Sequence, residues 1–471
     1  MNKDDLKKNI KKEIESISFI REISEFASKE HEVYIVGGFI RDILLGRERS
    51  EIDFLIVGDG IEFVEKLAAH LGVYKISVYK NFGTAHFNYK GYALEFVSSR
   101  QESYTSESRN PVVSSGTFED DIKRRDFTIN TLAVSLKSSN FGELIDCYSA
   151  LDAIEERIIK TPLEAEKTFN DDPLRIMRAF RFAAQLDFRL DEQVLNSAES
   201  MRERLSIVSQ ERVTDEFMKI LSSKKPSAAL IPMYKTKVLE IVFPEIHNLG
   251  GVDQRKDFHH KDVFYHTCKV VDNVALVSNN VWLRFAAIVH DIAKPQTKRF
   301  DEATGWTFHG HEEIGARMMN GIFKRMKLPY HKLEYVKKLI RLHLRPIALA
   351  KEEVTDSAIR RLIVEANEDL DDLIHLCRAD ITSKNVEKVS TFLANYDRVM
   401  ARVYEVLEKD ALRAFQSPVR GEVIMEVCGL KPSKTVGLIK SEIEEAILEG
   451  SIGNNYEEAY EYMLKIKDKY L

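Results

Sequence analysis

Cysteine is scarce in this sequence of 471 residues, and long apolar runs are absent. The four cysteines lie far apart and form no Cys-x-x-Cys pair, so we interpret them as reduced thiols of a cytoplasmic protein. No stretch of about 18 apolar residues occurs, which makes a membrane-spanning helix unexpected. The first residues, MNKDDLKKNIKKEIES, lack the apolar run of a signal peptide, so we expect no export.

A strong positive charge is also lacking, because the net charge is −6. A nucleic-acid partner would therefore have to bind a local basic patch. With 471 residues the chain is too long for a single hydrophobic core, and we expect roughly two to four domains. The sequence contains no low-complexity linker and no internal repeat, which predicts domains that pack directly on one another.

The pattern of apolar residues changes once, near Leu151. Before this point, strand-like runs such as YKISVYK, TAHFNY, ALEFVSS and ELIDCYS alternate with helical segments. After it the spacing is helical almost to the end, with prolines at the expected boundaries. These are Pro162, Pro173, Pro226, Pro295, Pro346 and Pro418. The sequence therefore predicts a multidomain α+β protein, in which an α/β head is followed by helical domains.

A glycine turn between two apolar strands is the most informative local pattern. Gly37 and Gly38 follow a short strand and lack the Cβ atoms that would keep phosphate oxygens from the backbone. Arg41 then lies in the first turn of the next helix. A Gly-Gly pair by itself merely ends a strand, but this turn can also face a triphosphate.

Two carboxylates follow on the second strand. Side chains alternate along a strand, so Glu51 and Asp53 share one face while Ile52 turns into the sheet. One hard cation such as Mg²⁺ can therefore bridge both carboxylates. Glu95, in another strand-like run, could supply a third if its strand neighbours that of Asp53. A lone Glu-x-Asp is usually solvated, but beside the glycine turn it favours metal-dependent binding of a nucleoside triphosphate.

The segment RRDFTINTLA follows these strands. It contains Arg124, Arg125 and Asp126, with Asn130 about one helical turn later. An isolated Arg-Arg-Asp is usually a surface ion-pair cluster. Its position directly after the carboxylate strands instead favours contact with phosphate or ribose hydroxyls.

The segment NDDPLRIMRAFRFAAQL predicts a further helix with a functional start. Asn170 or Asp171 is expected to cap it, and Pro173 fits its first turn. Asp172 and Arg175 are three residues apart, which predicts that they share one helical face.

This acid and guanidinium could select bases. An ionised Asp only accepts hydrogen bonds and an Arg only donates them, so together they match an amino donor beside a ring-nitrogen acceptor. Cytosine and adenine present this edge, whereas uracil and guanine present the reverse. The pattern therefore predicts selection of CTP and ATP without a template, with an ordinary surface ion pair as the alternative. Arg178 and Arg181 continue the face and could reach phosphates or an RNA end.

The second half contains an ordered set of histidines and aspartates. The set comprises His266, His290, Asp291, His311, His343 and Asp380. Mixed imidazole and carboxylate ligands suit Mn, Fe, Ni, Co or Zn better than an all-oxygen site would. A lone helical histidine is normally structural, and we expect this of others in the chain. Among them are His31, His70, His86, His259, His260, His309 and His375.

The motifs of the first half resemble those of class II tRNA nucleotidyltransferases, the bacterial CCA-adding enzymes of the DNA polymerase beta-like superfamily. They are GGFIRD with the carboxylate strand, FGTA from Phe82 to Ala85, RRDFTIN and DDPLRIMRAFRFAA. In that family a carboxylate pair binds two Mg²⁺ ions, an Arg-Asp motif binds the ribose, and an Asp and an Arg pair with the base. The matching residues here are Glu51 with Asp53, Arg125 with Asp126, and Asp172 with Arg175.

Two positions depart from this family's pattern. The family usually has Asp-x-Asp where this chain has Glu51, Ile52 and Asp53. Its Glu-Asp-x-x-Arg motif begins here with Asp171, a shorter acid.

The histidine set resembles that of the HD phosphohydrolase superfamily. In that superfamily a His, a His-Asp pair and a late Asp bind a divalent metal, here one of Mg, Mn, Ni, Co, Fe or Zn, and added histidines serve a second ion. HD domains joined to CCA-adding enzymes can show phosphatase and 2′,3′-cyclic phosphodiesterase activity.

These resemblances imply an enzyme that adds CCA to the tRNA 3′ end from CTP and ATP and releases pyrophosphate. They divide the chain into a polymerase beta-like catalytic head (1–150), a helical neck with the base-selecting motif (151–250), an HD domain (251–385) and a helical tail (386–471). Cations of the later helices, including KRMK from Lys324 to Lys327, are expected to hold tRNA phosphates.

Three other activities remain open. Bacterial poly(A) polymerases share the catalytic half but tend to carry a basic tail, whereas residues 442–464 are acidic. Enzymes that add only CC lack a flexible loop, and the span from Gln101 to Asp121 is long enough to be that loop; enzymes that add only A are closely related. The third is an HD phosphohydrolase whose head merely binds nucleotide or RNA. Glu51 keeps this alternative open, because the family usually has Asp at that position.

Overall fold

The computed structural model describes residues 3–27, 31–48, 50–80, 83–105, 108–252, 262–303, 305–349, 355–383, 385–414, 417–449 and 451–471. Phe82, His259 and His260 lie outside these ranges. The chain forms two compact units, Met1–Leu344 with Glu368–Val389, and Arg345–Asn367 with Ser390–Leu471. Within the described residues, no helix is both long and apolar enough to cross a membrane.

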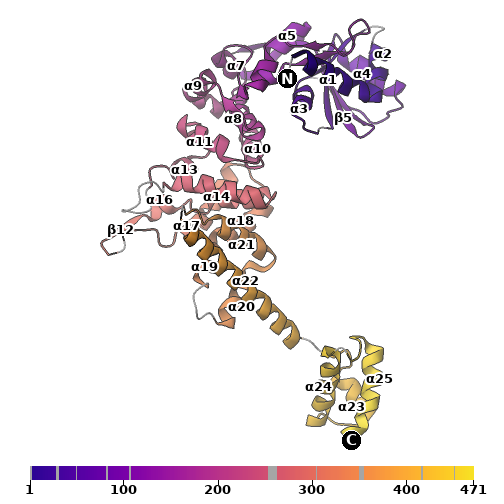
Figure 1. The fold of residues 1–471 in the computed structure, drawn as a ribbon, viewed down its shortest axis with the longest axis vertical. Helices are drawn as coiled ribbons and strands as arrows, with labels where there is room; N and C mark the ends of the chain where they lie inside the picture. Colours follow the sequence, from indigo (N-terminus) through magenta and orange to yellow (C-terminus); the bar gives the residue numbers. More distant parts are fainter. Residues whose placement is uncertain are drawn as a thin grey trace. The chain divides into compact units, whose positions relative to one another are not determined.

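The first unit contains a mixed seven-stranded sheet of order β3-β4-β5-β2-β1-β8-β9. Figure 1 labels one of its strands, β5, near the N-terminal helices. Its strands are β1 (Glu32–Val36), β2 (Glu51–Val57), β3 (Ser77–Tyr79), β4 (Thr84–Tyr89), β5 (Tyr92–Ser98), β8 (Ala133–Ser135) and β9 (Leu144–Ile145). β2 and β5 pair in parallel, and the other neighbours in this sheet pair antiparallel.

The two faces of this sheet differ in chemistry. On one face Phe54, Phe96 and Phe87 stack in a row, with ring centroids 4.7 and 5.3 Å apart, and each is at most 1% exposed. The other face carries Asp53 and Glu95. On this second face, α5 (Phe118–Lys123) covers β1 and β8 and contributes buried apolar side chains. The carboxylates therefore lie on the polar part of a sheet whose opposite face is core.

The remaining head elements are mostly short. They are α1 (Lys3–Ser16), α2 (Ser18–Ala27), α3 (Gly38–Leu44), α4 (Gly60–His70), β6 (Arg100–Thr105), β7 (Ser108–Ser115), η2 (Thr128–Asn130) and α6 (Ala150–Glu155). The span from Gln101 to Asp121, expected to be a flexible loop, instead carries the β6–β7 hairpin and the start of α5.

Helices dominate after the head, which confirms the predicted α+β organisation. The neck contains β10 (Ile158–Ile159), α7 (Ala165–Asp171), α8 (Leu174–Leu186), β11 (Arg189–Leu190), α9 (Glu192–Ser200), η3 (Arg202–Ile207), α10 (Gln210–Leu221), α11 (Ser227–Lys235), α12 (Val238–Val242) and α13 (Pro244–His247).

The expected start of the helix at Asp172 is wrong. Asn170 and Asp171 end α7, and Asp172 is extended, with φ −140° and ψ 104°. Proline disfavours the helical conformation in the residue before it, so Pro173 forces a break and α8 begins at Leu174. Asp172 and Arg175 therefore do not share one helical face. Asp172 caps α8 instead, because its Oδ1 accepts a hydrogen bond from Leu174 N at 3.1 Å.

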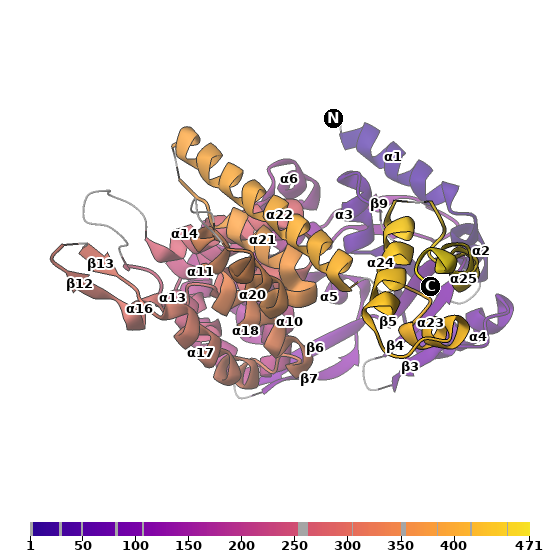
Figure 2. The same cartoon turned by 90° about the horizontal axis from the view of Figure 1, so that it is seen from below.

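The body that follows is built on α14 (Val263–Val277), α15 (Val281–Val289), α16 (Lys294–Thr297), α17 (His311–Arg325), η4 (Tyr330–Lys332), α18 (Leu333–Leu342), η5 (Asn367–Asp369) and α21 (Leu370–Ala379). A hairpin of β12 (Arg299–Asp301) and β13 (Gly305–Thr307) extends from it beyond α16 (Figure 2).

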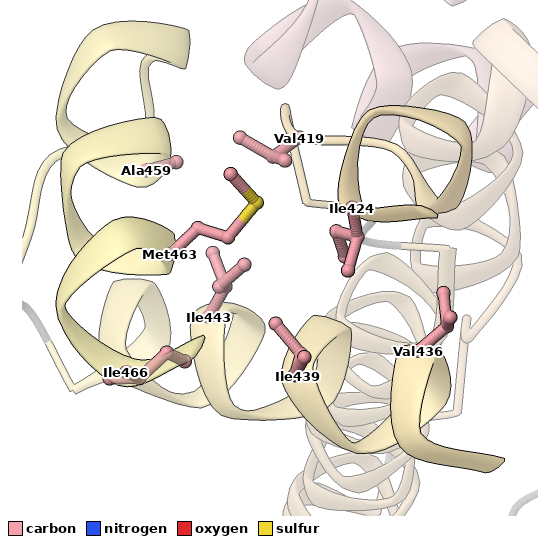
Figure 3. Close-up of a cluster of buried hydrophobic side chains, with 8 residues drawn as sticks. All are labelled: Val419, Ile424, Val436, Ile439, Ile443, Ala459, Met463 and Ile466. Carbon is pink, nitrogen blue, oxygen red and sulfur yellow. The ribbon is translucent and has the colours of Figure 1, made fainter. Parts of the chain in front are cut away.

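The second unit contains α19 (Arg345–Ala348), α20 (Asp356–Ala366), most of α22 (Val386–Ala414), α23 (Gly421–Cys428), α24 (Lys434–Leu448), α25 (Tyr456–Ile466) and η6 (Lys467–Lys469). Its last three α-helices enclose a core of their own (Figure 3). This core consists of Val419, Ile424, Val436, Ile439, Ile443, Ala459, Met463 and Ile466. The tail is therefore stabilised by local apolar packing.

Ile443→Ala should destabilise this tail strongly. Ile443 is fully buried, and deleting such a side chain costs roughly 2–5 kcal/mol through lost transfer energy and a cavity. Limited proteolysis should then cleave within α23–α25. Leu438→Ala on the same helix is the matched control, because Leu438 is 46% exposed, and it should leave the cleavage rate almost unchanged. Equal cleavage rates of the two variants would contradict the assigned core.

Candidate active site and metal centre

The carboxylates of the head meet across two paired strands. Asp53 pairs in register with Glu95, and Glu51 lies two residues earlier on the same face of β2. Ile52 is fully buried behind them. Burial and the nearby Asp53 raise the pKa of Glu95, against a smaller opposite effect of His86. Carboxylates that oppose each other's ionisation in this way form a set that a hard cation would stabilise.

The turn after β1 brings the backbone close to this set. Gly37 has φ +78°, and a Cβ there would lie 2.9 Å from Arg125 Nη1 and 3.8 Å from Asp53 Oδ2. A side chain at Gly37 would therefore be strained and would displace the guanidinium of Arg125. Gly38 begins α3, which carries Arg41.

A buried polar network lies beside the turn. Arg41 is 2% exposed and binds Asp42 through two hydrogen bonds of 2.9 and 3.0 Å. Its Nη1 also donates to Asn130 Oδ1 at 2.6 Å, and Asn130 Nδ2 donates to Asp126 Oδ1 at 2.9 Å. Arg178 Nε donates to the other oxygen of Asp126 at 2.8 Å. The network thus connects α3, η2 and the neck helix α8.

Asp126 is the acid at the centre of this network. Burial alone would raise its pKa, but Arg178, Asn130 and Arg175 together hold the pKa of Asp126 well below its usual value. Its carboxylate is therefore ionised at neutral pH and held in one orientation.

Both arginines of the Arg-Arg-Asp segment are anchored by Asp121, which is fully buried. Arg124 Nε donates to Asp121 Oδ1 at 3.0 Å, and Arg125 Nη2 to Asp121 Oδ2 at 3.1 Å. Arg125 Nη1 also donates to the Asn130 carbonyl at 3.3 Å. Asp121 was not selected from the sequence, although its spacing of four residues from Arg125 is a recognised helical ion-pair signal.

The proposed base-selecting pair is not joined in the structure. Arg175 is 9% exposed and donates to the Arg124 carbonyl at 2.7 Å and to the Thr168 carbonyl at 3.4 Å. Asp172 lies 3.6 Å from Arg212 Nη2 on α10. Arg175 therefore contacts the Arg-Arg-Asp segment, and Asp172 pairs with the neck helix α10.

Arg181 points to the neck. It binds Glu216 at 2.5 Å and Gln185 at 2.9 Å, and its guanidinium lies 4.1 Å from the Phe182 ring centroid. Arg178 and Arg181 therefore do not form one row of cations toward solvent. The sequence contained no local signal for Glu216, which comes from a different helix.

The histidines and aspartates of the second half converge on one centre. Ligand-type atoms fall in two groups in which the atoms lie within 4.8 Å of one another. The groups are His266, His290 and Asp380, and Asp291, His311 and His343. They are joined through Asp291, whose carboxylate oxygens lie 3.2 Å from His290 Nε2 and 3.3 Å from His311 Nε2. All six side chains selected from the sequence are thus brought together.

Each imidazole is oriented by its Nδ1. The Nδ1 atoms of His290, His311 and His343 lie 2.6 to 2.7 Å from the carbonyl oxygens of Ala287, Phe308 and Ile340. A carbonyl can only accept, so each of these Nδ1 atoms carries a proton and each Nε2 faces the centre, where it can bind a metal once it has lost any proton of its own. His266 Nδ1 is held by Thr382 Oγ1 at 2.8 Å.

The electrostatics of this centre fit a bound cation. His290 Nε2 and Asp291 Oδ2 are both buried and lie 3.2 Å apart, and Lys294 Nζ lies 2.6 Å from the same carboxylate oxygen. Burial opposes protonation of His290, but Asp291 and Asp380 outweigh it and raise the pKa of His290 to about 10. Burial and the neighbouring His290 lower the pKa of His343 to about 4. A divalent metal would bind both atoms and take the place of the proton on His290.

Lys294 is a member of this centre that the sequence did not suggest. Its Nζ lies 2.6 Å from Asp291 Oδ2 and 5.6 Å from the Phe308 ring centroid. The spacing of three residues from Asp291 on a helical segment is the signal that could have found it. Of the KRMK segment, Arg325 is bound to Glu245 by two hydrogen bonds of 2.6 Å, and Lys324 and Lys327 are exposed.

Three family descriptions match the chain in order. They are the poly A polymerase head domain over residues 33–160, the probable RNA and SrmB-binding site of polymerase A over 187–249, and the HD domain over 263–384. The families of the head and of the HD domain are metal-dependent.

Two relatives match most of the chain. An A-adding tRNA nucleotidyltransferase of Deinococcus radiodurans is 30% identical over 351 residues, which are 72% of this chain and 77% of that protein. A multifunctional CCA protein of Xanthomonas campestris is 29% identical over 412 residues, 83% of this chain and 96% of that protein.

The fold is shared with a tRNA nucleotidyltransferase solved with a primer tRNA and an incoming ATP analog. The TM-score is 0.59 at 23% identity, and the match covers 81% of this chain and 99% of the other. The resemblance predicted from the motifs is thereby confirmed. The order of head, RNA-binding segment and HD domain, together with these relatives, shows that the chain belongs to the class II tRNA nucleotidyltransferases, the CCA-adding enzymes with an HD domain.

Proposed function

We propose that this protein adds CCA to the 3′ end of tRNA, using CTP and ATP and releasing pyrophosphate. The observation that carries the proposal is the register of β2 with β5, which places Asp53 opposite Glu95 beside the Asp126 network. The relatives named A-adding and multifunctional CCA proteins support it. Scarce cysteines support a cytoplasmic location.

The domain division into 1–150, 151–250, 251–385 and 386–471 is part of this proposal. The matched ranges 33–160, 187–249 and 263–384 support the first three. The separate core of α23–α25 supports the tail.

Glu51, Asp53 and Glu95 would hold Mg²⁺ in the head. When bound there, the ion supplies a Lewis acid that lowers the pKa of the RNA 3′-hydroxyl and neutralises triphosphate charge. The in-register pairing of Asp53 with Glu95 orients two of these carboxylates without the help of a mobile loop.

The nucleotide would lie between the glycine turn and α8. The residues proposed to bind it are Gly37, Gly38, Arg41, Arg125, Asp126, Asn130, Asp172, Arg175, Arg178 and Arg181. Asp126 is ionised and held by Arg178, so it can accept a hydrogen bond from a ribose hydroxyl. Arg125, oriented by Asp121, provides a cation for phosphate. Arg41 is buried and acts through Asn130.

Base selection is assigned to Asp172 and Arg175. Arg175 Nη1 donates a long hydrogen bond of 3.4 Å to the Thr168 carbonyl. This N–H is the donor that a base can take over. Asp172 uses Oδ1 for the cap of α8, which leaves Oδ2 near Arg212 as its acceptor for a base amino group. The two side chains thus meet the base from either side of Pro173.

We propose phosphohydrolase activity for the HD centre as a second function. The two groups of ligand-type atoms, each within 4.8 Å, support a divalent metal there. The ligands would be His266, His290, Asp291, His311, His343 and Asp380, and the ion one of Mg, Mn, Ni, Co, Fe or Zn. When bound, it supplies an activated water for attack on a phosphoester.

The test is to incubate the purified protein with tRNA lacking CCA, Mg²⁺ and each NTP in turn. Extension by C, C and A supports the proposal. Addition of A alone, of CC alone or of an A ladder assigns the chain to an A-adding enzyme, a CC-adding enzyme or a poly(A) polymerase. If no nucleotide is incorporated but a 2′,3′-cyclic phosphate is hydrolysed, the HD function is the only one of the two that remains.

Asp53→Ala should abolish incorporation of both nucleotides, because it removes a carboxylate from the proposed metal set. Glu62→Ala, at an exposed position of α4, is the control and should retain activity. Single-turnover extension of tRNA lacking CCA measures the rates. A near-normal rate for Asp53→Ala would exclude this residue from the site.

Asp172→Asn should relax base choice more than it weakens binding. The amide oxygen keeps the cap of α8, while the second oxygen, an acceptor, becomes a donor. Discrimination against UTP and GTP, measured as the ratio of kcat/KM values, should fall about tenfold for the loss of one polar contact. Unchanged rejection of UTP and GTP would refute the assignment.

The double substitution His290→Ala and Asp291→Ala should eliminate hydrolysis of a 2′,3′-cyclic phosphate and leave CCA addition largely intact. Removing both residues avoids a single uncompensated buried charge. Both activities are measured on one preparation, with bound metal determined by elemental analysis. Loss of metal with unchanged hydrolysis would place that activity elsewhere.

A further inference from the structure

A cavity of about 490 Å³ lies on the polar face of the head sheet, next to Glu95. It is lined by Tyr79, Thr84, His86, Glu95 and Arg100. Its volume falls within the roughly 300–1,000 Å³ of pockets that bind small molecules. Except for Glu95, none of the proposed catalytic or nucleotide-binding residues lines it, so it needs a separate explanation.

The strand registers connect this cavity to the catalytic carboxylates. Asp53 pairs with Glu95, and Glu95 pairs with His86 on β4. Residues that face each other across paired strands point to the same side of a sheet. Thr84 and Tyr79 pair with each other in the same way at the outer edge. One polar row therefore runs from the metal strand to the cavity.

The cavity lies on the opposite side of β2 from the residues proposed to bind the nucleotide. Those residues follow β1 or come from η2 and α8, and β1 is one neighbour of β2. The other neighbour is β5, followed by β4 and β3. In phosphoryl transfer the attacking and leaving oxygens are roughly in line. If the triphosphate lies toward β1, the attacking hydroxyl approaches from the side of β5.

We propose that this cavity binds the 3′-terminal nucleotide of the acceptor RNA, an inference that rests on the proposed nucleotidyl transfer. The terminal base stacks on Tyr79, whose side chain is half exposed, and on His86. Arg100 pairs with the phosphate, and the 3′-hydroxyl lies at the carboxylate end, near Glu95. The charges match this orientation, because the cation of Arg100, at the cavity wall, attracts a phosphate.

Aromatic contacts suit the requirement of the reaction. The acceptor end is a different nucleotide after each addition, so its subsite cannot read one base edge. Every base has a π-face, and stacking on aromatic side chains is therefore tolerant of sequence. A lone histidine such as His86 gave no functional signal in the sequence. Its assignment comes from the register with Glu95 and from the cavity.

A photocrosslink tests the location. A tRNA that ends before CCA and carries 4-thiouridine as its terminal nucleotide is bound to the full-length protein and irradiated, and the crosslinked peptide is identified by mass spectrometry. We expect the crosslink within residues 77–100. A crosslink confined to the neck or the tail would overturn the proposal.

Kinetics provide the second measurement. Tyr79→Ala and His86→Ala should each lower kcat/KM for tRNA roughly five- to a hundred-and-fiftyfold, the range for loss of one base–aromatic stack. Binding of CTP, measured without RNA, should stay unchanged. Tyr79→Phe keeps the ring and should restore the rate.

Tyr74→Ala is the matched control, because Tyr74 is 99% exposed and does not line the cavity. Unchanged kcat/KM for tRNA in both alanine variants, or failure of Tyr79→Phe to restore it, would refute the stacking role. If the unsubstituted protein extends no tRNA at all, the proposed function fails instead.

Discussion

The parallel pairing of β2 with β5 is the constraint on which the head depends. Parallel strands cannot be joined by a tight turn, and the chain between them makes a long crossover through α4, β3 and β4. That crossover brings Glu95 beside Asp53 and leaves Phe54 and Phe96 stacked on the other face. A slip of one residue would exchange the two faces and place a carboxylate in the core. The same apolar stack that stabilises the sheet therefore also fixes which acids meet.

The second determinant is a charge buried between head and neck. Asp126 belongs to the head, whereas Arg178 comes from α8. Losing either partner would leave an uncompensated buried charge, which is far more costly than losing an exposed pair. Arg175 reinforces this contact by donating to the Arg124 carbonyl. The elements proposed to bind phosphate, ribose and base are thus connected by polar contacts with defined directions.

Local patterns predicted much of this architecture. The alternation around Asp53 and the glycine turn depend on residues close in sequence, and the structure shows the expected strand there, with Gly37 at a positive φ. The HD ligands are far apart in sequence, from His266 to Asp380, and their convergence was predicted by resemblance to a superfamily and not by a local pattern. Partners from distant elements, such as Glu216 for Arg181, had no sequence signal because tertiary packing alone brings them together. The polar span after Arg100 suggested a loop but forms a hairpin. The helix start at Asp172 was misplaced because the effect of Pro173 on the preceding residue outweighed the apparent cap.

That proline has a consequence for the shape of the site. It has no amide hydrogen, and its ring keeps Asp172 out of the helical conformation, so α7 and α8 cannot fuse into a single rod whatever ligand is present. Asp172 consequently joins the two helices: its amide donates to the Thr168 carbonyl of α7, and its carbonyl accepts a hydrogen bond from Arg175 N of α8. The acid and the guanidinium proposed to select the base therefore sit on opposite sides of a fixed bend in the backbone.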